Sequence, residues 1–293
     1  MRFLVVIGRA LLALVAIVFV AALVLGFLGG RKAGARHGVP GSVLLASAPG
    51  DPDAMARGSH WASILGCRDC HGEDLQGTVM VDVPPFRATA SNLTRGAGGV
   101  GASYGPADWD RAVRYGVKPD GTAVQFMMPS ALYHGLADED MADLASYLSS
   151  VASVDHELPP SELRMPGKII AGAGGLDPAS AVSAPDRPRA PAPPLATRGA
   201  TAEFGRYLAS ITCVECHGDD LKGGRHPDPS GPAGPSLAGA ANWTAEEFRL
   251  GVTLGVAPGG RPLDPKWMPW PAFQHFTADE VAALRNHLKA IFP

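Results

Sequence analysis

The sequence predicts an all-α protein in which one N-terminal transmembrane helix precedes two copies of a single helical domain. Three observations support this prediction. The N-terminus is a long apolar run, a cysteine-containing motif occurs twice, and the segment after each copy has apolar residues at helical spacing. With 293 residues, the chain has room for two domains of ordinary size.

The composition excludes two broad classes of protein. Lys and Arg total 25 against 28 Asp and Glu, and a formal net charge of -3 argues against nucleic-acid binding, which requires a basic surface. A hydrophobic content of 46% excludes general disorder. The 36 glycines and 27 prolines indicate loop-rich domains and a linker.

The N-terminal segment 3–28 is expected to be a membrane anchor. Its stretch Ala10–Leu28 is uncharged and apolar, and about 20 such residues cross a bilayer as a helix. A signal peptide has an apolar core of roughly 7–15 residues with a cleavage site close behind it. Here the small-residue site Ala46-Ser47-Ala48 lies far beyond the run, so we expect an uncleaved anchor. Basic residues flank both ends, and charge alone does not orient the helix.

The rest of the chain is an internal duplication. Cys67–Gly77 (CRDCHGEDLQG) recurs as Cys213–Gly223 (CVECHGDDLKG), and a Met-Pro pair follows each copy. We place the first domain at 52–156 and the second at 200–293. The proline-rich segment 157–199 between them is expected to be an extended linker.

A C-terminal helix is predicted at the end of each copy, because its apolar residues step by 3, 4 and 3 along one helical face. These residues are Met141, Leu144, Leu148 and Val151 in the first copy, and Val281, Leu284, Leu288 and Ile291 in the second. Thr277 and Glu280 form a capping-box pattern in the second copy. The first copy has Ala137 in place of the threonine, so Asp138 is expected to cap its helix.

All four cysteines lie in two CxxCH motifs, Cys67-x-x-Cys70-His71 and Cys213-x-x-Cys216-His217. A zinc site would need CxxC pairs about 15–20 residues apart, and a thioredoxin-like CxxC would not need the following histidine. CxxCH is the signature of c-type haem attachment: the thiols form thioethers with the haem vinyl groups and the histidine binds the iron. The sequence therefore predicts two covalently bound haem c groups.

A sixth iron ligand is expected from the methionine of each Met-Pro pair, Met128 and Met268. A thioether ligand fills the iron and raises its reduction potential. Met127 competes only in the first copy, because Trp267 is its counterpart, and Met141 is expected in the core. The remaining histidines have no repeated partner, so we expect packing or surface roles for them.

These motifs resemble the class I cytochrome c fold in tandem, over 52–156 and 200–293. The resemblance implies that the first helix of each domain crosses the last one at a glycine, Gly58 near Tyr147 and Gly205 near His287. It also implies a proline carbonyl that accepts the Nδ1 proton of the iron-binding histidine. Pro235 fits this role in the second copy, and Pro84 or Pro85 in the first.

The first copy further resembles the cytochrome c subunits of bacterial membrane-bound alcohol and gluconate dehydrogenases. The resemblance lies in Ser91–Thr94 (SNLT), Tyr104–Trp109 (YGPADW), Arg114–Val117 (RYGV) and Met128-Pro129. Those subunits usually carry three haems, whereas this chain has two motifs. Haem attachment in such proteins takes place outside the cytoplasm. The resemblance therefore implies a bacterial inner-membrane protein with both haem domains on the periplasmic side.

The leading functional hypothesis is a di-haem electron carrier, not an enzyme. It would pass single electrons from a dehydrogenase or quinol-oxidising complex to a soluble cytochrome or terminal oxidase. An alternative is a di-haem peroxidase-like enzyme in which one haem lacks its methionine, with His134 as the replacement ligand or acid–base group. A third hypothesis is a permanent cytochrome subunit of a larger respiratory or photosynthetic complex, with the same chemistry.

Overall fold

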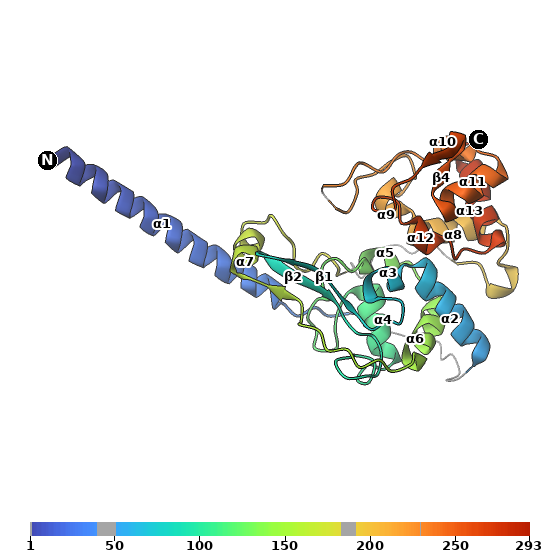
Figure 1. The fold of residues 1–293 in the computed structure, drawn as a ribbon, viewed down its shortest axis with the longest axis horizontal. Helices are drawn as coiled ribbons and strands as arrows, with labels where there is room; N and C mark the ends of the chain where they lie inside the picture. The colour runs from blue at the N-terminus through green and yellow to red at the C-terminus, as the bar shows by residue number, and fades with distance from the viewer. Residues whose placement is uncertain (1, 40–50, 183–191, 229) are drawn as a thin grey trace.

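The computed structural model describes residues 2–39, 51–182, 192–228 and 230–293. An N-terminal helix leads into a first domain, and a second domain packs against the first (Figure 1). The small-residue site Ala46-Ser47-Ala48 and part of the proline-rich linker lie outside the described residues. The structure is mostly helical, as the sequence predicts.

Helix α1 (Arg2–Ala33) projects from the first domain (Figure 1). Its segment Val5–Ala33 has a mean hydropathy of 3.1 in its most apolar window, and 6% of that window is buried against the protein. By length and composition this segment can cross a membrane. It is the one such helix in the part of the chain that the structure describes.

The two domains repeat one helical arrangement. The first has α2 (Pro52–Ile64), α3 (Cys67–His71), α4 (Pro106–Tyr115), α5 (Ser130–Tyr133) and α6 (Asp138–Ser150). The second has α8 (Ala202–Thr212), α9 (Val214–His217), α10 (Ala238–Ala241), α11 (Ala245–Leu254), α12 (Trp270–Phe273) and α13 (Ala278–Ile291). The predicted duplication is therefore visible in the fold.

The first and last helices of each domain cross at the expected glycines. A Cβ at Gly58 would lie 2.1 Å from Asp143 O and 2.7 Å from the Cβ of Tyr147. A Cβ at Gly205 would lie 1.9 Å from Ala283 O. Because only glycine permits this approach of two helix backbones, the crossing that the resemblance implied is confirmed in both copies.

Short strands accompany the helices. In the first domain β1 (Thr78–Val83) and β2 (Phe86–Ala90) form an antiparallel hairpin with an irregularity between Val79 and Val81. β3 (Glu162–Leu163) extends this sheet from the linker. In the second domain β4 (Val256–Ala257) and β5 (Arg261–Pro262) pair around the short helix η2 (Pro258–Gly260). These strands are an addition to the expected all-α plan.

The linker is partly folded. Besides β3 it contains α7 (Met165–Gly172), which packs against α1, and η1 (Leu195–Thr197). Arg198, just after η1, binds Glu139 and Asp140 of the first domain. The described part of the linker therefore contacts both the N-terminal helix and the domain that precedes it.

The capping prediction holds for the second copy and is wrong for the first. Thr277 and Glu280 make the expected reciprocal capping box at the start of α13. In α6 the N-cap is Ala137, and the carboxylate of Asp138 instead accepts a hydrogen bond from Arg114. This carboxylate is bound by the buried guanidinium of Arg114 and does not cap the helix.

Aromatic residues meet where the two domains pack together. Trp61 in α2 and Tyr207 in α8 have their rings edge to face with centroids 6.2 Å apart. Both rings belong to one hydrophobic core, which therefore continues from one domain into the other.

Carboxylates at matching places reinforce this interface. Asp140 in α6 accepts a hydrogen bond of 2.6 Å from the hydroxyl of Tyr207. Glu280 in α13 lies 2.8 Å from Nε2 of His60 in α2. The Tyr207 hydroxyl also accepts the N–H of Ala137 at 3.1 Å, so the second domain supplies the cap that α6 lacks in its own sequence.

Candidate haem-binding sites

Each CxxCH motif forms one short helix at the end of the first helix of its domain. In α3 and α9 the two cysteines are three residues apart, which places both thiols on one side of a single turn with the histidine beside them. Gly72 and Gly218 follow the histidines with φ of 81° and 80°, a conformation that glycine adopts without strain. The chain therefore turns away immediately after each histidine in the same manner.

Both histidine rings are oriented by a backbone carbonyl. Nδ1 of His71 lies 2.7 Å from Ser91 O, and Nδ1 of His217 lies 2.8 Å from Pro235 O. A ring that donates its Nδ1 proton to a carbonyl keeps the lone pair of Nε2 for a metal. The Pro235 expectation is thus confirmed.

The proline expectation for the first copy is wrong. Neither Pro84 nor Pro85 approaches His71 through a hydrogen bond; Pro85 O accepts the N–H of Arg164 instead. Ser91 takes the place that Pro235 has in the second copy. The leucine two residues later bonds equivalently in both copies: Leu93 N–H to Leu75 O at 2.8 Å, and Leu237 N–H to Leu221 O at 2.9 Å.

Burial sets the protonation of the histidines. It lowers the pKa of His71 and of His217 below the ordinary value, while the hydrogen bonds to the two carbonyls act in the opposite direction. Both imidazoles are therefore neutral near pH 7, which is the form that binds a metal.

The four cysteines form no disulfide with one another. Burial raises the pKa of Cys67 to about 12 and that of Cys216 to about 11, and it also raises the pKa values of Cys70 and Cys213. Redox-active CxxC motifs have lowered thiol pKa values, so these motifs do not suit dithiol exchange. Among the described residues, no group of three or more His, Cys, Asp and Glu side chains could hold a metal, which argues against a zinc site.

The two Met-Pro pairs have the same local structure. Pro129 and Pro269 have φ/ψ of -82°/48° and -77°/51°, and each begins a one-turn helix, α5 or α12. Met128 and Met268 are partly buried against the core of their domains. Met127 is 43% exposed, which favours Met128 over its neighbour. Met141 is fully buried in α6, as expected for a core residue.

A buried donor in the first domain is suited to an additional polar group. Trp109 in α4 is 2% exposed, and its indole Nε1 has no hydrogen-bond partner among the described residues. Leaving such a donor unsatisfied is costly, and a carboxylate of a bound cofactor would satisfy it. This observation, together with two thiols and an oriented imidazole in each copy, fits covalently bound haem.

His134 has a packing role in the first domain. It is 2% exposed, its Nδ1 lies 3.2 Å from Arg114 O, and its ring lies edge to face with Tyr115 at 5.2 Å. These contacts place the ring between α4 and the end of α5. Nothing in this arrangement favours it over Met128 as an iron ligand.

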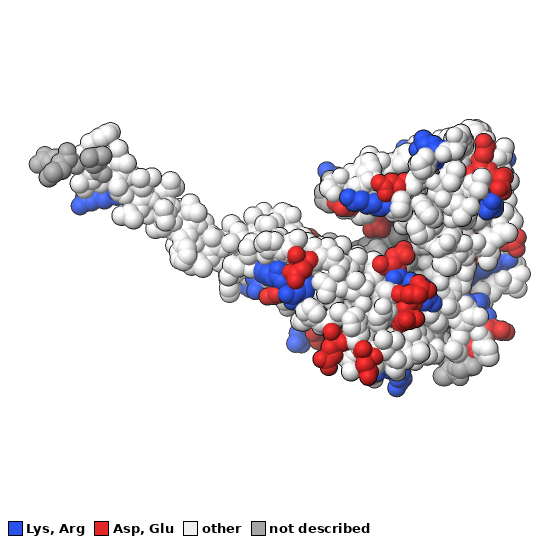
Figure 2. Space-filling model, in the orientation of Figure 1, with Lys and Arg blue, Asp and Glu red and all other residues white. Residues whose placement is uncertain are grey.

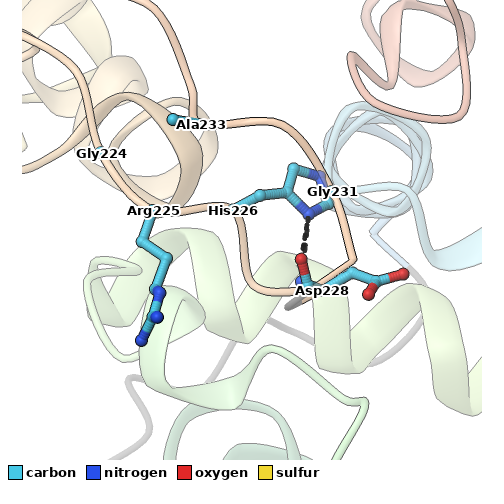
Figure 3. Close-up of a pocket in the computed structure, with 6 residues that line it drawn as sticks. All are labelled: Gly224, Arg225, His226, Asp228, Gly231 and Ala233. Atoms are coloured by element: carbon cyan, nitrogen blue, oxygen red, sulfur yellow. Dashed lines mark hydrogen bonds between the residues drawn. The ribbon is translucent and has the colours of Figure 1, made fainter.

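A cavity of about 360 Å³ lies in the loop that follows the second CxxCH motif. Figure 3 shows the ring of His226 turned toward Asp228, while the side chain of Arg225 points away from both. The ring of His226 also lies edge to face with Trp267 at 5.2 Å, next to Met268. One residue that lines the cavity, His226, therefore contacts the segment that carries Met268.

Ser91 is the functional residue that the sequence reasoning missed. The resemblance implied a proline near the motif, whereas the function is carried by a backbone carbonyl, which any residue type can supply. The signal that could have found it is a leucine two residues later in both copies, Leu93 after Ser91 and Leu237 after Pro235, although the two loops differ in length.

Comparison with known proteins identifies the domains. The family model for cytochrome c matches the chain twice, at residues 55–152 and 202–291. Both matches contain one CxxCH motif and one Met-Pro pair. Domains of this family bind haem c covalently through that motif.

Two of the curated proteins similar to this chain are cytochrome subunits of dehydrogenases. The fructose dehydrogenase cytochrome subunit of Gluconobacter japonicus is 30% identical over 41% of this chain and 26% of its own length. The gluconate 2-dehydrogenase cytochrome c subunit of Pantoea cypripedii is 27% identical over 82% of this chain and 60% of its own length. The chain thus spans less than two thirds of the length of either relative.

Proposed function

Because the chain belongs to the cytochrome c family, we propose that it is a membrane-anchored di-haem cytochrome c that carries single electrons. The donor would be a dehydrogenase or a quinol-oxidising complex, and the acceptor a soluble cytochrome or a terminal oxidase. The observation that carries the proposal is the duplicated site: two CxxCH helices with carbonyl-oriented histidines, and two Met-Pro segments of closely matching backbone geometry.

We assign one haem to each domain. Cys67 and Cys70 would hold the first through thioethers, and His71 and Met128 would bind its iron. The corresponding residues in the second domain are Cys213, Cys216, His217 and Met268. Haem iron, when bound, supplies a one-electron redox couple.

The residues around each site support a carrier. The carbonyls of Ser91 and Pro235 fix the orientation of the two imidazoles, and a fixed neutral ring is the better ligand. A methionine that also binds the iron would leave no open coordination position for peroxide or oxygen. Partial burial against the core limits the contact of both methionines with water.

The interface between the domains supports transfer between two fixed sites. The Trp61–Tyr207 contact, the bond from Tyr207 to Asp140 and the His60–Glu280 pair join the first and last helices of both domains. Each CxxCH helix begins where the first helix of its domain ends. Packing these helices together therefore fixes the two attachment sites relative to each other.

Helix α1 and the relatives support a proposal for the location of the protein. We propose that α1 spans the inner membrane of a bacterium once, with its N-terminus inside and both domains in the periplasm, where c-type haem is attached. Both relatives are named as cytochrome subunits of sugar or sugar-acid dehydrogenases. This supports a dehydrogenase as the donor, with the chain as its partner or its permanent subunit.

A redox titration of the purified full-length holoprotein, followed by optical absorbance, tests the proposal. We expect two low-spin haems per chain that titrate in one-electron steps at fairly high potential and do not bind carbon monoxide or peroxide. A high-spin haem that binds either ligand would instead support a peroxidase-like enzyme. Co-purification with a flavin- or quinone-containing dehydrogenase after mild solubilisation would distinguish a permanent subunit from a mobile carrier.

A further inference from the structure

Helix α7 of the linker crosses α1 near its C-terminal end (Figure 1). A Cβ at Gly26 would lie 2.8 Å from Sδ of Met165, at the start of α7. A Cβ at Gly172, at the end of α7, would lie 2.0 Å from Leu25 O. The two ends of α7 are about 10 Å apart along its axis, yet both contact one turn of α1. Residues at the start and at the end of α7 therefore contact the same turn of α1.

The crossing is a close backbone contact. A Cβ at Gly29 would lie 1.9 Å from Lys168 O, and Gly26 and Gly29 are both buried although most of α1 is exposed. The ammonium group of Lys32 donates to Ala171 O at 2.9 Å near the end of α7. Small residues that let two helix backbones touch are characteristic of tightly packed membrane helices.

The contact falls on the apolar part of α1. The charge-free run of this helix ends at Gly30, and Arg31 follows. Leu25 precedes Arg31 by about 9 Å along the helix. Figure 2 shows blue atoms on α1 near its N-terminal end and only white atoms from there toward the first domain. A helix that lies in the membrane interface is buried by about 5–10 Å, which agrees with the depth of this crossing.

The exposed face of α7 is apolar. Pro166, Ile170 and Ala173, at spacings of four and three, are all exposed, and Met165 beside them is 53% exposed. The one charge within α7 is the half-buried Lys168. An exposed apolar face that continues from an apolar helix is covered by lipid at lower free-energy cost than by water.

The other side of α7 is joined to the first domain. A Cβ at Gly167 would lie 2.2 Å from Pro85 O, at the tip of the β1–β2 hairpin. Arg164, the N-cap of α7, donates its N–H to Pro85 O at 3.0 Å and its guanidinium to Asp82 at 2.6 Å. The position of α7 therefore determines how the first domain is oriented relative to α1.

We propose that α7 is an interfacial helix that lies in the plane of the periplasmic membrane surface, with its apolar face among the lipid headgroups and upper acyl chains. Docked in this way, it holds the first haem domain in one orientation to the bilayer. The inference rests on the proposed role of α1 as a membrane anchor. Its partner is the lipid bilayer, not another protein chain.

Spin labels on the full-length holoprotein in liposomes test this proposal. The variants Ile170→Cys, Val18→Cys and Leu254→Cys place a nitroxide on α7, in the middle of α1, and on an exposed apolar position of the second domain. The native cysteines are consumed by thioethers, so the added thiol takes the label. Collision rates with oxygen, which concentrates in lipid, and with a water-soluble nickel chelate report the surroundings, and the haem spectrum confirms folding.

We expect the Ile170 label to collide with nickel several-fold less than the Leu254 label and with oxygen several-fold more, at a shallower depth than Val18. Nickel accessibility at Ile170 equal to that at Leu254, with Val18 in lipid, would overturn the interfacial helix and leave the anchor intact. Low accessibility to both reagents would overturn it in favour of a protein contact. A water-accessible Val18 would refute the anchor, and the interfacial helix with it.

Discussion

The substitution Tyr207→Phe tests whether the two domains depend on each other. The Tyr207 hydroxyl belongs to the second domain but accepts the N–H of Ala137 at 3.1 Å and donates to Asp140 at 2.6 Å, both in the first. Phenylalanine keeps the ring packed against Trp61 and removes only these two bonds. The buried carboxylate of Asp140 retains Arg198.

The expected cost follows from the two bonds. A hydrogen bond to a charged group contributes about 1.5–3 kcal/mol and a neutral one about 0.5–1.5 kcal/mol. Losing both should destabilise the start of α6 by about 2–4 kcal/mol. Since about 1.4 kcal/mol is a factor of ten, amide exchange in α6 should accelerate by about 30-fold or more.

Hydrogen–deuterium exchange of the holoprotein, read by mass spectrometry on peptides from α6, measures this effect. Thr277→Ala is the matched control, because it removes the hydroxyl cap of α13 within its own domain. The control should accelerate exchange in α13 and leave α6 unchanged. If Tyr207→Phe accelerates exchange only around α8, or leaves α6 as protected as before, the first domain does not use the second as its cap and the reasoning is refuted.

Three further predictions concern the second domain. Gly205→Ala should prevent the α8–α13 crossing, because its Cβ would lie 1.9 Å from Ala283 O; a second domain that melts at the original temperature would contradict this. Burial, and to a smaller extent the nearby charge of Arg206, lower the pKa of His287 below its ordinary value of 6.5. The neutral His287 therefore contributes to stability above pH 6.5, and this contribution is lost as the pH falls through the pKa of the folded state. His287→Tyr, which copies Tyr147 of the first domain, should reduce the loss of melting temperature between pH 7 and 5, and an unchanged loss would contradict it. Cys213→Ala with Cys216→Ala should lower the intact mass by one haem, and loss of both haems or of neither would argue against one attachment site per domain.

The duplication made most of the architecture predictable. The helices after each Met-Pro pair and the Thr277–Glu280 capping box follow from local sequence patterns that occur in register. The helix crossings at Gly58 and Gly205 follow from the resemblance to the class I cytochrome c fold. The β1–β2 hairpin was not expected, although the β-branched residues between Thr78 and Val83 favour a strand.

The features that escaped prediction depend on contacts between distant segments. Ser91 acts through its carbonyl, which carries no side-chain signature. Asp138 carries a good N-cap side chain, but Arg114 competes for it, and the cap comes instead from Tyr207, 70 residues from Ala137 along the chain. Likewise α7 was not predicted, because the prolines of its segment indicated an extended chain. Its glycine Gly172 permits the close contact with α1, which the local sequence does not indicate.

The central claim is that each domain holds one haem between its own histidine and its own methionine. The near-infrared absorption band of a thioether bound to oxidised haem iron reports this ligand directly. We predict that Met128→Ala and Met268→Ala each remove about half of the band, that the double variant removes all of it, and that Met127→Ala leaves it unchanged. A band that survives the double variant, or that is lost entirely in one single variant, would contradict the account.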